Sequence, residues 1–202
     1  MGTIAYEVYN GLYLNITNRC PCACTFCLRD GAEGLNPGEN LWLEHEPTQA
    51  EILEALNRFK LSRYEEAVFC GYGEPCERLD MLLQTAEYIK EESGLPVRLN
   101  TNGLGDLINK KATAPLLIGH VDHVSISLNA ADKESYNAIC RPSFGADAYD
   151  AMIKFALSVK EAGIKVNFSV VDILQAEELR KCQELSASLG IPLRVRSVIY
   201  SK

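Results

Sequence analysis

The stretch His123-Val124-Ser125-Ile126-Ser127-Leu128-Asn129 decides the fold class. Its apolar residues alternate with polar ones, which indicates a strand with one face against a core and one polar face. The stretch also lies between helical patterns, and strands that alternate with helices form parallel sheets. Parallel strands covered on both faces normally have almost continuous apolar sequences. The alternation therefore predicts a parallel sheet with helices on one face only.

The segments on either side of this strand set the order of elements. Polar and apolar residues also alternate at 97–102 and 164–169, and less regularly at 193–198. Two more strands are expected at 12–17 and 66–71, and helical patterns separate the strands at 48–59, 79–93, 105–117, 146–162 and 177–189. A strand at 4–8 is joined to 12–17 by Asn10-Gly11, a pair that favours a hairpin turn. The expected order is six strands with five helical connections, preceded by a hairpin arm.

Five crossover helices on one face of a parallel sheet favour a curled sheet over a flat one. We expect an α/β fold, specifically a partial (β/α)6 TIM-like barrel with a short N-terminal β-hairpin arm and a polar, ligand-sized interior. Its ligand would bind at the carboxyl ends of the strands. A chain of 202 residues fits one domain. Residues 1–202 are therefore predicted to form a single domain, with a loop at 18–47 inside it.

Composition and cysteine spacing limit the function classes. The 20 basic and 27 acidic residues give a net charge of −7, which argues against nucleic acid or an anionic membrane as the partner. The N-terminus has no secretory signal pattern, and no apolar run is long enough to span a membrane. Of the eight cysteines, four lie between positions 20 and 27, which is too close for a disulfide framework. We expect a protein of the reducing cytoplasm whose clustered thiolates bind metal.

The cysteine cluster reads Cys20-Pro21-Cys22-Ala23-Cys24-Thr25-Phe26-Cys27. Taken as C-x3-C-x2-C, it offers the thiolates of Cys20, Cys24 and Cys27 to three irons of a [4Fe–4S] cluster, and the fourth iron is left open for a substrate or cofactor. A structural zinc site is the alternative, with Cys22 or the pair Cys70 and Cys76 completing the ligands. Zinc normally takes two separated pairs of ligands, and these spacings fit that pattern poorly.

The cysteine motif, with an aromatic residue before its third cysteine, resembles the signature of the radical S-adenosylmethionine (radical SAM) superfamily. Further motifs with the same resemblance follow the second, third and fourth strands, namely Gly71-Tyr72-Gly73-Glu74-Pro75, Asn100-Thr101-Asn102-Gly103, Ser127-Leu128-Asn129, Tyr136 and Arg141-Pro142. Within the superfamily, the phrase Leu14-Asn15-Ile16-Thr17-Asn18-Arg19-Cys20 is most similar to the TatD-associated radical SAM proteins. The resemblance covers nearly the whole chain and makes residues 1–202 a radical SAM domain, with Cys22 and Cys76 as departures from the usual motifs.

The resemblance implies roles for individual residues. Cys20, Cys24 and Cys27 would bind the [4Fe–4S] cluster, and Phe26 would pack beside the adenine of S-adenosylmethionine unless it is simply a core residue. The remaining cofactor contacts would come from Gly71, Tyr72, Gly73, Glu74, Asn100, Asn102, Ser127, Asn129 and Arg196. In this set the Gly71–Glu74 turn would hold the methionine ammonium group, Ser127 and Asn129 would bind ribose hydroxyls or the carboxylate, and Arg196 would bind that carboxylate, an anionic substrate or a structural partner.

The function implied is reductive cleavage of S-adenosylmethionine to a 5′-deoxyadenosyl radical, which abstracts hydrogen from a substrate. An electron donor of the flavodoxin or ferredoxin type is the implied partner. The substrate is either a partner protein that closes the open barrel, as for glycyl-radical activases, or a small anionic metabolite. A non-catalytic zinc- or iron–sulfur-binding module is the alternative function. Arg98, Lys165 and Arg194 lie nearer the strand starts and are expected to be structural, whereas Cys76 and Cys140 follow strand ends and could face the active site.

Overall fold

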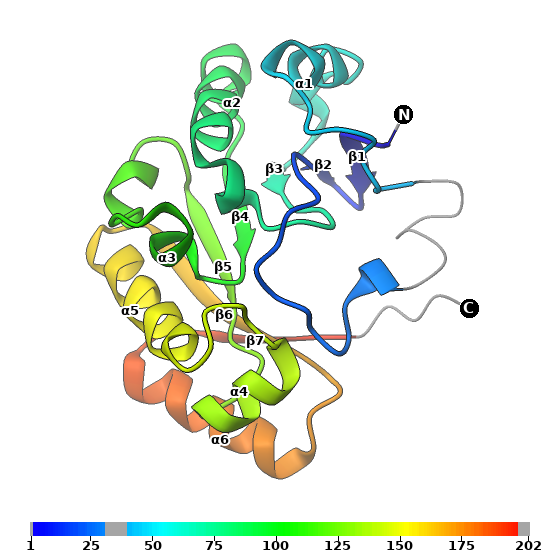
Figure 1. The fold of residues 1–202 in the computed structure, drawn as a ribbon. Coiled ribbons are helices and arrows are strands. Elements are labelled where there is room, and N and C mark those ends of the chain that lie inside the picture. The colour runs from blue at the N-terminus through cyan, green and yellow to red at the C-terminus, as the bar shows by residue number, and fades with distance from the viewer. Residues whose placement is uncertain (1, 31–39, 198–202) are drawn as a thin grey trace.

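The computed structural model describes residues 2–30 and 40–197, and its strands form one curved sheet (Figure 1). Seven strands follow one another across the sheet in chain order, and no pairing joins the first to the last within the described residues. The strands are β1 (Ala5–Val8), β2 (Gly11–Leu14), β3 (Glu66–Phe69), β4 (Val97–Thr101), β5 (His123–Ser127), β6 (Lys165–Val171) and β7 (Leu193–Arg196). The expected α/β fold with an open, partial barrel is confirmed.

The strands pair as the alternation predicted. Each neighbouring pair from β2 to β7 is parallel, and β1 runs antiparallel to β2 as a hairpin arm. Val8 pairs with Gly11, so the turn residues are Tyr9 and Asn10, with Tyr9 at a φ of 51°. The predicted turn at Asn10-Gly11 is therefore displaced by one residue, because Gly11 already belongs to β2.

The helices cover the outer face of the curved sheet, and the chain that follows β2, over residues 15–30, passes across the carboxyl ends of the strands (Figure 1). The α-helices are α1 (Gln49–Leu56), α2 (Leu79–Ser93), α3 (Gly105–Asn109), α4 (Lys133–Cys140), α5 (Asp147–Glu161) and α6 (Ala176–Leu189). Short 3-10 helices lie at η1 (Leu28–Asp30), η2 (Leu61–Arg63), η3 (Pro75–Arg78) and η4 (Ala114–Leu117). None of the described helices is both long and apolar enough to cross a membrane.

Two helical segments differ from the sequence-based expectation. The single helix expected at 105–117 is two short pieces, α3 and η4, because Lys110 takes a left-handed conformation that ends α3. Helix α4 was not expected at all. Asp132 caps it by accepting a hydrogen bond from the Ser135 backbone N–H at 2.9 Å. This helix matters for the site because its carboxyl end holds the cysteine loop.

The two faces of the sheet have different chemistry, as the alternation required. Between the sheet and the helices, residues such as Leu99, Val124, Ile126 and Phe168 are completely buried in one apolar core. The opposite face turns its polar side chains into the interior of the curved sheet. These inward residues include Arg98, Asn100, Ser125, Ser127, Ser169, Arg194 and Arg196.

Candidate functional site

The cysteine loop is held on one side by the end of helix α4. The backbone N–H of Ala23 donates to the Cys140 carbonyl at 3.1 Å, and that of Thr25 donates to the Ile139 carbonyl at 2.9 Å. A third bond runs the other way, from the Ser143 N–H to the Pro21 carbonyl at 2.8 Å. Tyr136 belongs to this helix, and Arg141-Pro142 forms the turn after it. These motif residues are therefore part of the support on which the cysteine loop lies.

On its other side, the loop is continuous with a segment packed against the glycine-rich turn after β3. A Cβ atom on Gly73 would lie 2.2 Å from the Thr17 carbonyl oxygen, and one on Gly71 would lie 2.1 Å from the Asn15 side-chain oxygen. The Glu74 N–H also donates to the Arg19 carbonyl at 2.8 Å. The two glycines are therefore required by the close approach of the chain that leads into Cys20, whatever they also contribute to a ligand.

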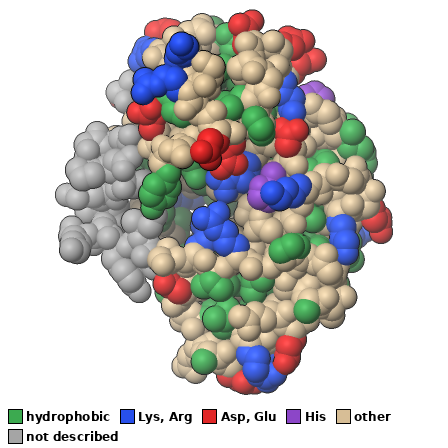
Figure 2. Space-filling view, turned by 180° about the vertical axis from the view of Figure 1, so that it is seen from behind, with side chains coloured by type: hydrophobic (Ala, Val, Ile, Leu, Met, Phe, Trp, Pro, Cys, Tyr) green, Lys and Arg blue, Asp and Glu red, His purple; other side chains and the backbone are tan. Residues whose placement is uncertain are grey.

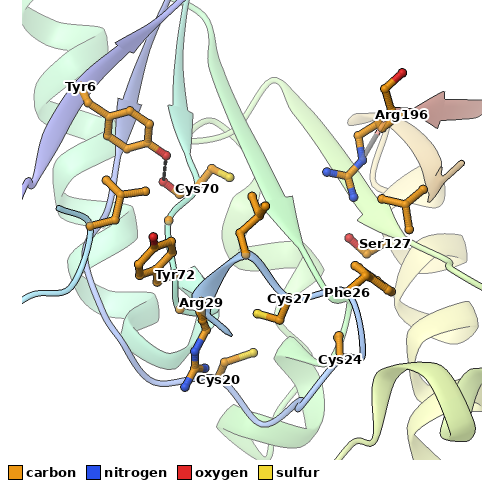
Figure 3. Close-up of a pocket in the computed structure, with 16 residues that line it drawn as sticks. Tyr6, Cys20, Cys24, Phe26, Cys27, Arg29, Cys70, Tyr72, Ser127 and Arg196 are labelled. Carbon is orange, nitrogen blue, oxygen red and sulfur yellow. Dashed lines mark hydrogen bonds between the residues drawn. The ribbon is translucent and has the colours of Figure 1, made fainter. Parts of the chain in front are cut away.

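Three of the four clustered cysteines line one cavity of about 240 Å³ (Figure 3). Cys20, Cys24 and Cys27 lie on its wall, and their thiols are free. Cys22 does not line this cavity, and only 8% of its surface is exposed. The remaining lining residues are Tyr6, Phe26, Leu28, Arg29, Leu41, Cys70, Gly71, Tyr72, Gly73, Ser127, Val171, Arg196 and Ser197.

The thiols of this loop are not equivalent. Hydrogen bonds from the side chains of Cys140 and then Cys22 lower the pKa of Cys24 to about 4. A hydrogen bond from Cys22 likewise lowers the pKa of Cys20, whereas burial raises the pKa of Cys27. Because the thiolate is the metal-binding form, the lowered pKa values of Cys20 and Cys24 favour the form that binds iron.

These residues fit an iron–sulfur cluster by the chemistry of their donors. Three cysteines line a space larger than a single ion needs, and cysteine thiolates are the usual ligands of such clusters. Within the described residues, no three Cys, His, Asp or Glu side chains are close enough together to hold one metal ion. The carbonyl oxygen of the Asn129 side chain is buried nearby without a hydrogen-bond partner.

The residues expected to contact S-adenosylmethionine fall into three groups. Phe26, Gly71, Tyr72, Gly73, Ser127 and Arg196 line the cavity with the cysteines. Glu74 and Asn100 instead line a second, adjoining cavity, which Ser127 and Arg196 share. Neither cavity is lined by Asn102 or Asn129.

The two asparagines outside the cavities both lie next to cysteine sulfur. The Asn102 side-chain N–H group lies 3.9 Å from the Cys20 sulfur and 3.7 Å from that of Cys22. The Asn129 side chain donates to the Cys140 sulfur at 3.4 Å. In this structure both side chains support the cysteine loop and its neighbour Cys140.

The Glu74 carboxylate is hydrogen-bonded to the surrounding protein. It accepts hydrogen bonds from the Thr101 hydroxyl at 2.8 Å, the Asn102 backbone N–H at 2.7 Å and the Cys76 backbone N–H at 3.1 Å. Only 3% of the residue is exposed, and burial raises its pKa. Glu74 therefore ties the ends of β3 and β4 together, a structural role that the glycine-rich motif alone did not reveal.

Sequence reasoning missed several residues of the first cavity. Tyr6 comes from the hairpin arm, where its hydroxyl donates to the Cys70 carbonyl at 3.0 Å. Leu41 comes from the chain before α1, and Arg29 lies over the Trp42 ring at 5.2 Å. Val171 had a usable signal, because it ends a strand on its polar face. The rest of the 28–47 loop at 31–39 lies outside the described residues.

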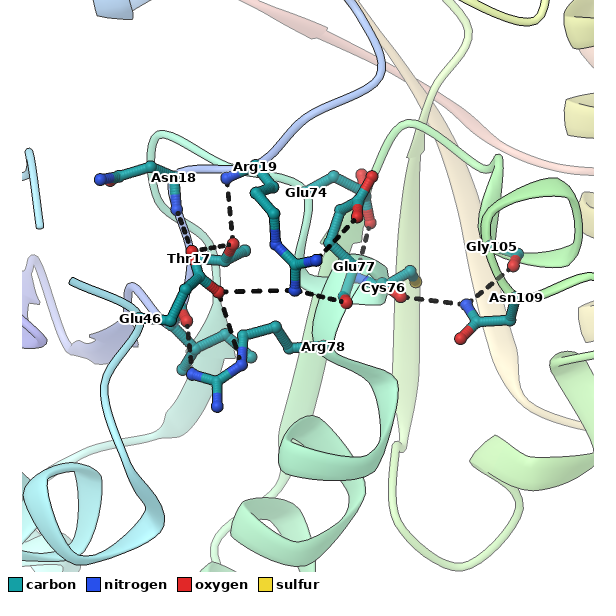
Figure 4. Close-up of polar contacts among 11 residues, drawn as sticks. Thr17, Asn18, Arg19, Glu46, Glu74, Cys76, Glu77, Arg78, Gly105 and Asn109 are labelled. Carbon is teal, nitrogen blue, oxygen red and sulfur yellow. Dashed lines mark hydrogen bonds and ion pairs between the residues drawn. The ribbon is translucent and has the colours of Figure 1, made fainter.

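The segment before the cysteines is fastened by Arg78 (Figure 4). Its guanidinium group donates to the carbonyls of Ile16 at 3.2 Å and Pro47 at 2.5 Å, and it lies 3.5 Å from the Glu46 carboxylate. Glu46 in turn accepts a hydrogen bond from the Thr17 hydroxyl at 2.9 Å. This network joins η3 to the chain on both sides of the cysteine loop.

Replacing Arg78 with Ala should lower the free energy of unfolding by about 2–3 kcal/mol, because it leaves two carbonyls without their donor and removes one of the two cations beside Glu46. Urea denaturation followed by circular dichroism measures this loss. The control is Arg58→Ala, since Arg58 pairs with Glu54 on the exposed surface of α1, and its loss should cost no more than about 0.5 kcal/mol. Equal effects for the two variants would show that Arg78 does not fasten the segment.

The chain is similar in sequence to a known family and to several characterised enzymes. Residues 14–184 match the family model described as the radical SAM superfamily. The dual-specificity RNA methyltransferase RlmN of Sulfurimonas denitrificans is 30% identical over 143 residues, which are 66% of this chain and 37% of that enzyme. The GTP 3′,8-cyclase of Corynebacterium glutamicum strain R is 30% identical over 194 residues, covering 93% of this chain and 48% of the cyclase. The chain thus spans about half the length of these relatives, or less.

Among solved structures, Streptococcus suis SuiB bound to S-adenosylmethionine is similar with a TM-score of 0.64. The likeness covers 94% of this chain and 39% of SuiB, at 21% sequence identity. At that identity it shows the shared fold alone. The family match and the shared fold agree with each other.

Proposed function

We propose that this chain, which belongs to the radical SAM superfamily of enzymes, binds a [4Fe–4S] cluster through Cys20, Cys24 and Cys27 and cleaves S-adenosylmethionine reductively. When bound, the cluster and S-adenosylmethionine would supply a 5′-deoxyadenosyl radical, formed with release of methionine when one electron enters. That radical would take a hydrogen atom from the substrate. Members of the family use this cluster and this cofactor.

One observation carries the proposal. The three cysteines of the C-x3-C-x2-C pattern line the same cavity as Gly71, Tyr72 and Gly73, whereas the intervening Cys22 does not. The motif and the glycine-rich turn are about 50 residues apart in the sequence, and the close approach at Gly73 brings them together. A protein that only binds metal does not need a glycine-rich turn on the wall of the same cavity.

The chain's own residues would bind and orient the cofactor and keep water out. Phe26 and Tyr72 offer ring surface for the adenine, and Tyr72 is held in place by an edge contact with Trp42 at 5.2 Å. Ser127 offers a hydroxyl to the polar parts of the cofactor, and Arg196 lies where this cavity meets the adjoining one. Glu74 and Asn100 would contact the cofactor from the adjoining cavity. The side-chain carbonyl of Asn129 and the side-chain amide of Asn102 would contact it from beside the cysteines.

The proposal extends to subgroup, domain and electron donor. The phrase 14–20 favours the TatD-associated group, and the continuous fold supports a single radical SAM domain over 1–202. Because the reaction consumes one electron, a flavodoxin- or ferredoxin-type protein is the proposed donor.

Anaerobic reconstitution with iron and sulfide should give a brown protein with about four irons per chain. Addition of dithionite and S-adenosylmethionine should then release 5′-deoxyadenosine and methionine in equal amounts, measured by liquid chromatography and mass spectrometry. Protein without iron serves as the control. One equivalent of zinc with no 5′-deoxyadenosine would instead support the non-catalytic binding module.

A further inference from the structure

A second cavity opens from the first toward the interior of the curved sheet. Its volume is about 170 Å³, and Cys70, Gly71, Gly73, Ser127 and Arg196 line both spaces. Its other lining residues are Glu74, Arg98, Asn100, Thr101, Ser125, Ser169 and Arg194. Three arginines thus surround a space smaller than the roughly 300–1,000 Å³ of a typical ligand pocket. Figure 2 shows basic side chains gathered at the centre of the face opposite the view of Figure 1.

Arg98 is a built part of this cavity. Its side chain is 9% exposed and pairs with Glu66 at 2.7 Å, and it also donates to the Tyr13 hydroxyl at 3.1 Å. The Nε–H group of the same guanidinium is buried without a hydrogen-bond partner. An unpaired buried donor costs free energy, so its presence beside a cavity points to a ligand that accepts from it. The expected structural role accounts for only part of this side chain.

Arg194 and Arg196 add two cations from β7. Within the described residues, neither forms an ion pair with a carboxylate, and the Arg196 Nε–H group is also buried without a partner. Burial lowers the pKa of Arg196, and repulsion from Arg194 and Arg98 contributes to that shift. Arg194 is exposed, so water screens its charge, but Arg98 is buried and Arg196 is half-buried beside the same space. A negative charge among them would stabilise these cations.

The protein itself supplies little of that negative charge. Among the residues that the structure describes, Glu74 is the one acidic residue on the wall of this cavity, and its oxygens accept hydrogen bonds from Thr101 and two backbone N–H groups. Glu66 is paired with Arg98. The Asn100 side-chain oxygen is buried without a donor, and the hydroxyls of Ser125 and Ser169 lie on the same wall. The cavity therefore offers cations and neutral polar groups to a ligand.

We propose that the substrate of this chain is a small organic anion whose carboxylate or phosphate group binds among Arg98, Arg194 and Arg196. This inference rests on the proposed function, since the adjoining cavity would hold the cofactor that reacts with the substrate. The anionic group anchors the molecule, and its uncharged part extends past Ser127 toward the cysteine cavity. A small metabolite is favoured over a partner protein because Arg98 and Arg196 are buried or half-buried on the wall of a small cavity, with Arg194 at its exposed side.

Binding of two probes, inorganic phosphate and succinate, tests this site by isothermal titration calorimetry. The reconstituted protein is saturated with S-adenosylmethionine and kept without a reductant, so no turnover contributes. At least one probe should bind saturably, and which one binds distinguishes a phosphate from a carboxylate anchor. Arg194→Met should weaken that binding at least tenfold. It should not lower the melting temperature, because Arg194 has no carboxylate partner among the described residues.

The matched control is Lys165→Met, which removes one positive charge from the neighbouring strand at a residue that does not line the cavity. It should leave the affinity for the probe within twofold. Arg196→Met should weaken the probe as Arg194→Met does, which ties the effect to the cavity and not to net charge. Equal affinity in Arg194→Met and the unmodified chain would overturn the proposal.

Two further outcomes would also overturn it. If neither probe binds, the arginines do not form an anion site. If a probe binds only without S-adenosylmethionine, the cations serve the carboxylate of the cofactor and not a substrate. Failure of the proposed function has a different signature, because it abolishes 5′-deoxyadenosine release while probe binding is measured separately.

Discussion

Replacing Cys24 with Ala should reduce the iron content of the reconstituted protein from about four atoms per chain to less than one. The side chain of Cys24 lines the first cavity, and its thiol is the one whose pKa is lowered to about 4 by hydrogen bonds from Cys140 and Cys22. Two remaining cysteines cannot hold three irons. Iron analysis and the visible absorbance of the cluster measure this loss, which should come with complete loss of 5′-deoxyadenosine release.

Cys22→Ala is the matched control for this variant, because it makes the same change two residues away in the same loop. Cys22 does not line the cavity, so the protein should keep about four irons. Cys182→Ala is a second control at a buried position of α6 away from the loop. A zinc site that used Cys22 would give the reverse pattern, with metal lost in Cys22→Ala as well as in Cys24→Ala.

The fold could be predicted from the sequence because its strands carry a periodic signal. Val124, Ile126 and Leu128 face the core, and the alternation at three other strands gave the same answer. Helix α4 gave no such signal. It has only eight residues, half of them polar, with two buried side chains, Tyr136 and Cys140. Its cap at Asp132 was the one usable indication, and short caps of this kind are also common in turns.

The candidate site was less predictable, and the reason lies at the strand ends. Alternation fixes the direction of a side chain only while the backbone stays extended. Strand β4 ends at Thr101, and Asn102 follows it; strand β5 ends at Ser127, and Asn129 lies two residues further on. Asn129 has a φ of 58°, so its backbone is no longer extended. Ser127, still inside its strand, lines both cavities as the alternation implied.

Arg98 and Arg194 illustrate a second limit of sequence reasoning. Their positions near the strand starts predicted a structural role at the closed end of the barrel. In a short strand, however, the first residues lie close to the cavity at its carboxyl end. In β7, Arg194 and Arg196 are two residues apart, and both line the second cavity. How far the cavity extends into the curved sheet depends on the packing of side chains from several strands. The sequence of one strand therefore does not predict it.

Gly73→Ala should destabilise the protein and also impair cluster binding, although Gly73 has no side chain to act as a ligand. Its new Cβ atom would lie 2.2 Å from the Thr17 carbonyl oxygen and 2.7 Å from that of Arg19. Both neighbours are backbone atoms, so the segment that leads into Cys20 must move. Overpacking of this kind costs about 1–3 kcal/mol, which urea denaturation of the cluster-free protein would measure.

The second effect separates this position from an ordinary packing site. Displacement of the segment before Cys20 should leave the reconstituted variant with well under four irons per chain, even where the protein remains folded. Gly11→Ala is the control, because the tightest contact of its Cβ atom would be with the Tyr13 ring at 3.1 Å, and a flexible side chain can yield. Among backbone atoms, the Val8 carbonyl oxygen would be at an ordinary contact distance of 3.6 Å. It should keep its full iron content. A folded Gly73→Ala variant with about four irons would show that the glycine-rich turn does not set the position of the cysteine loop.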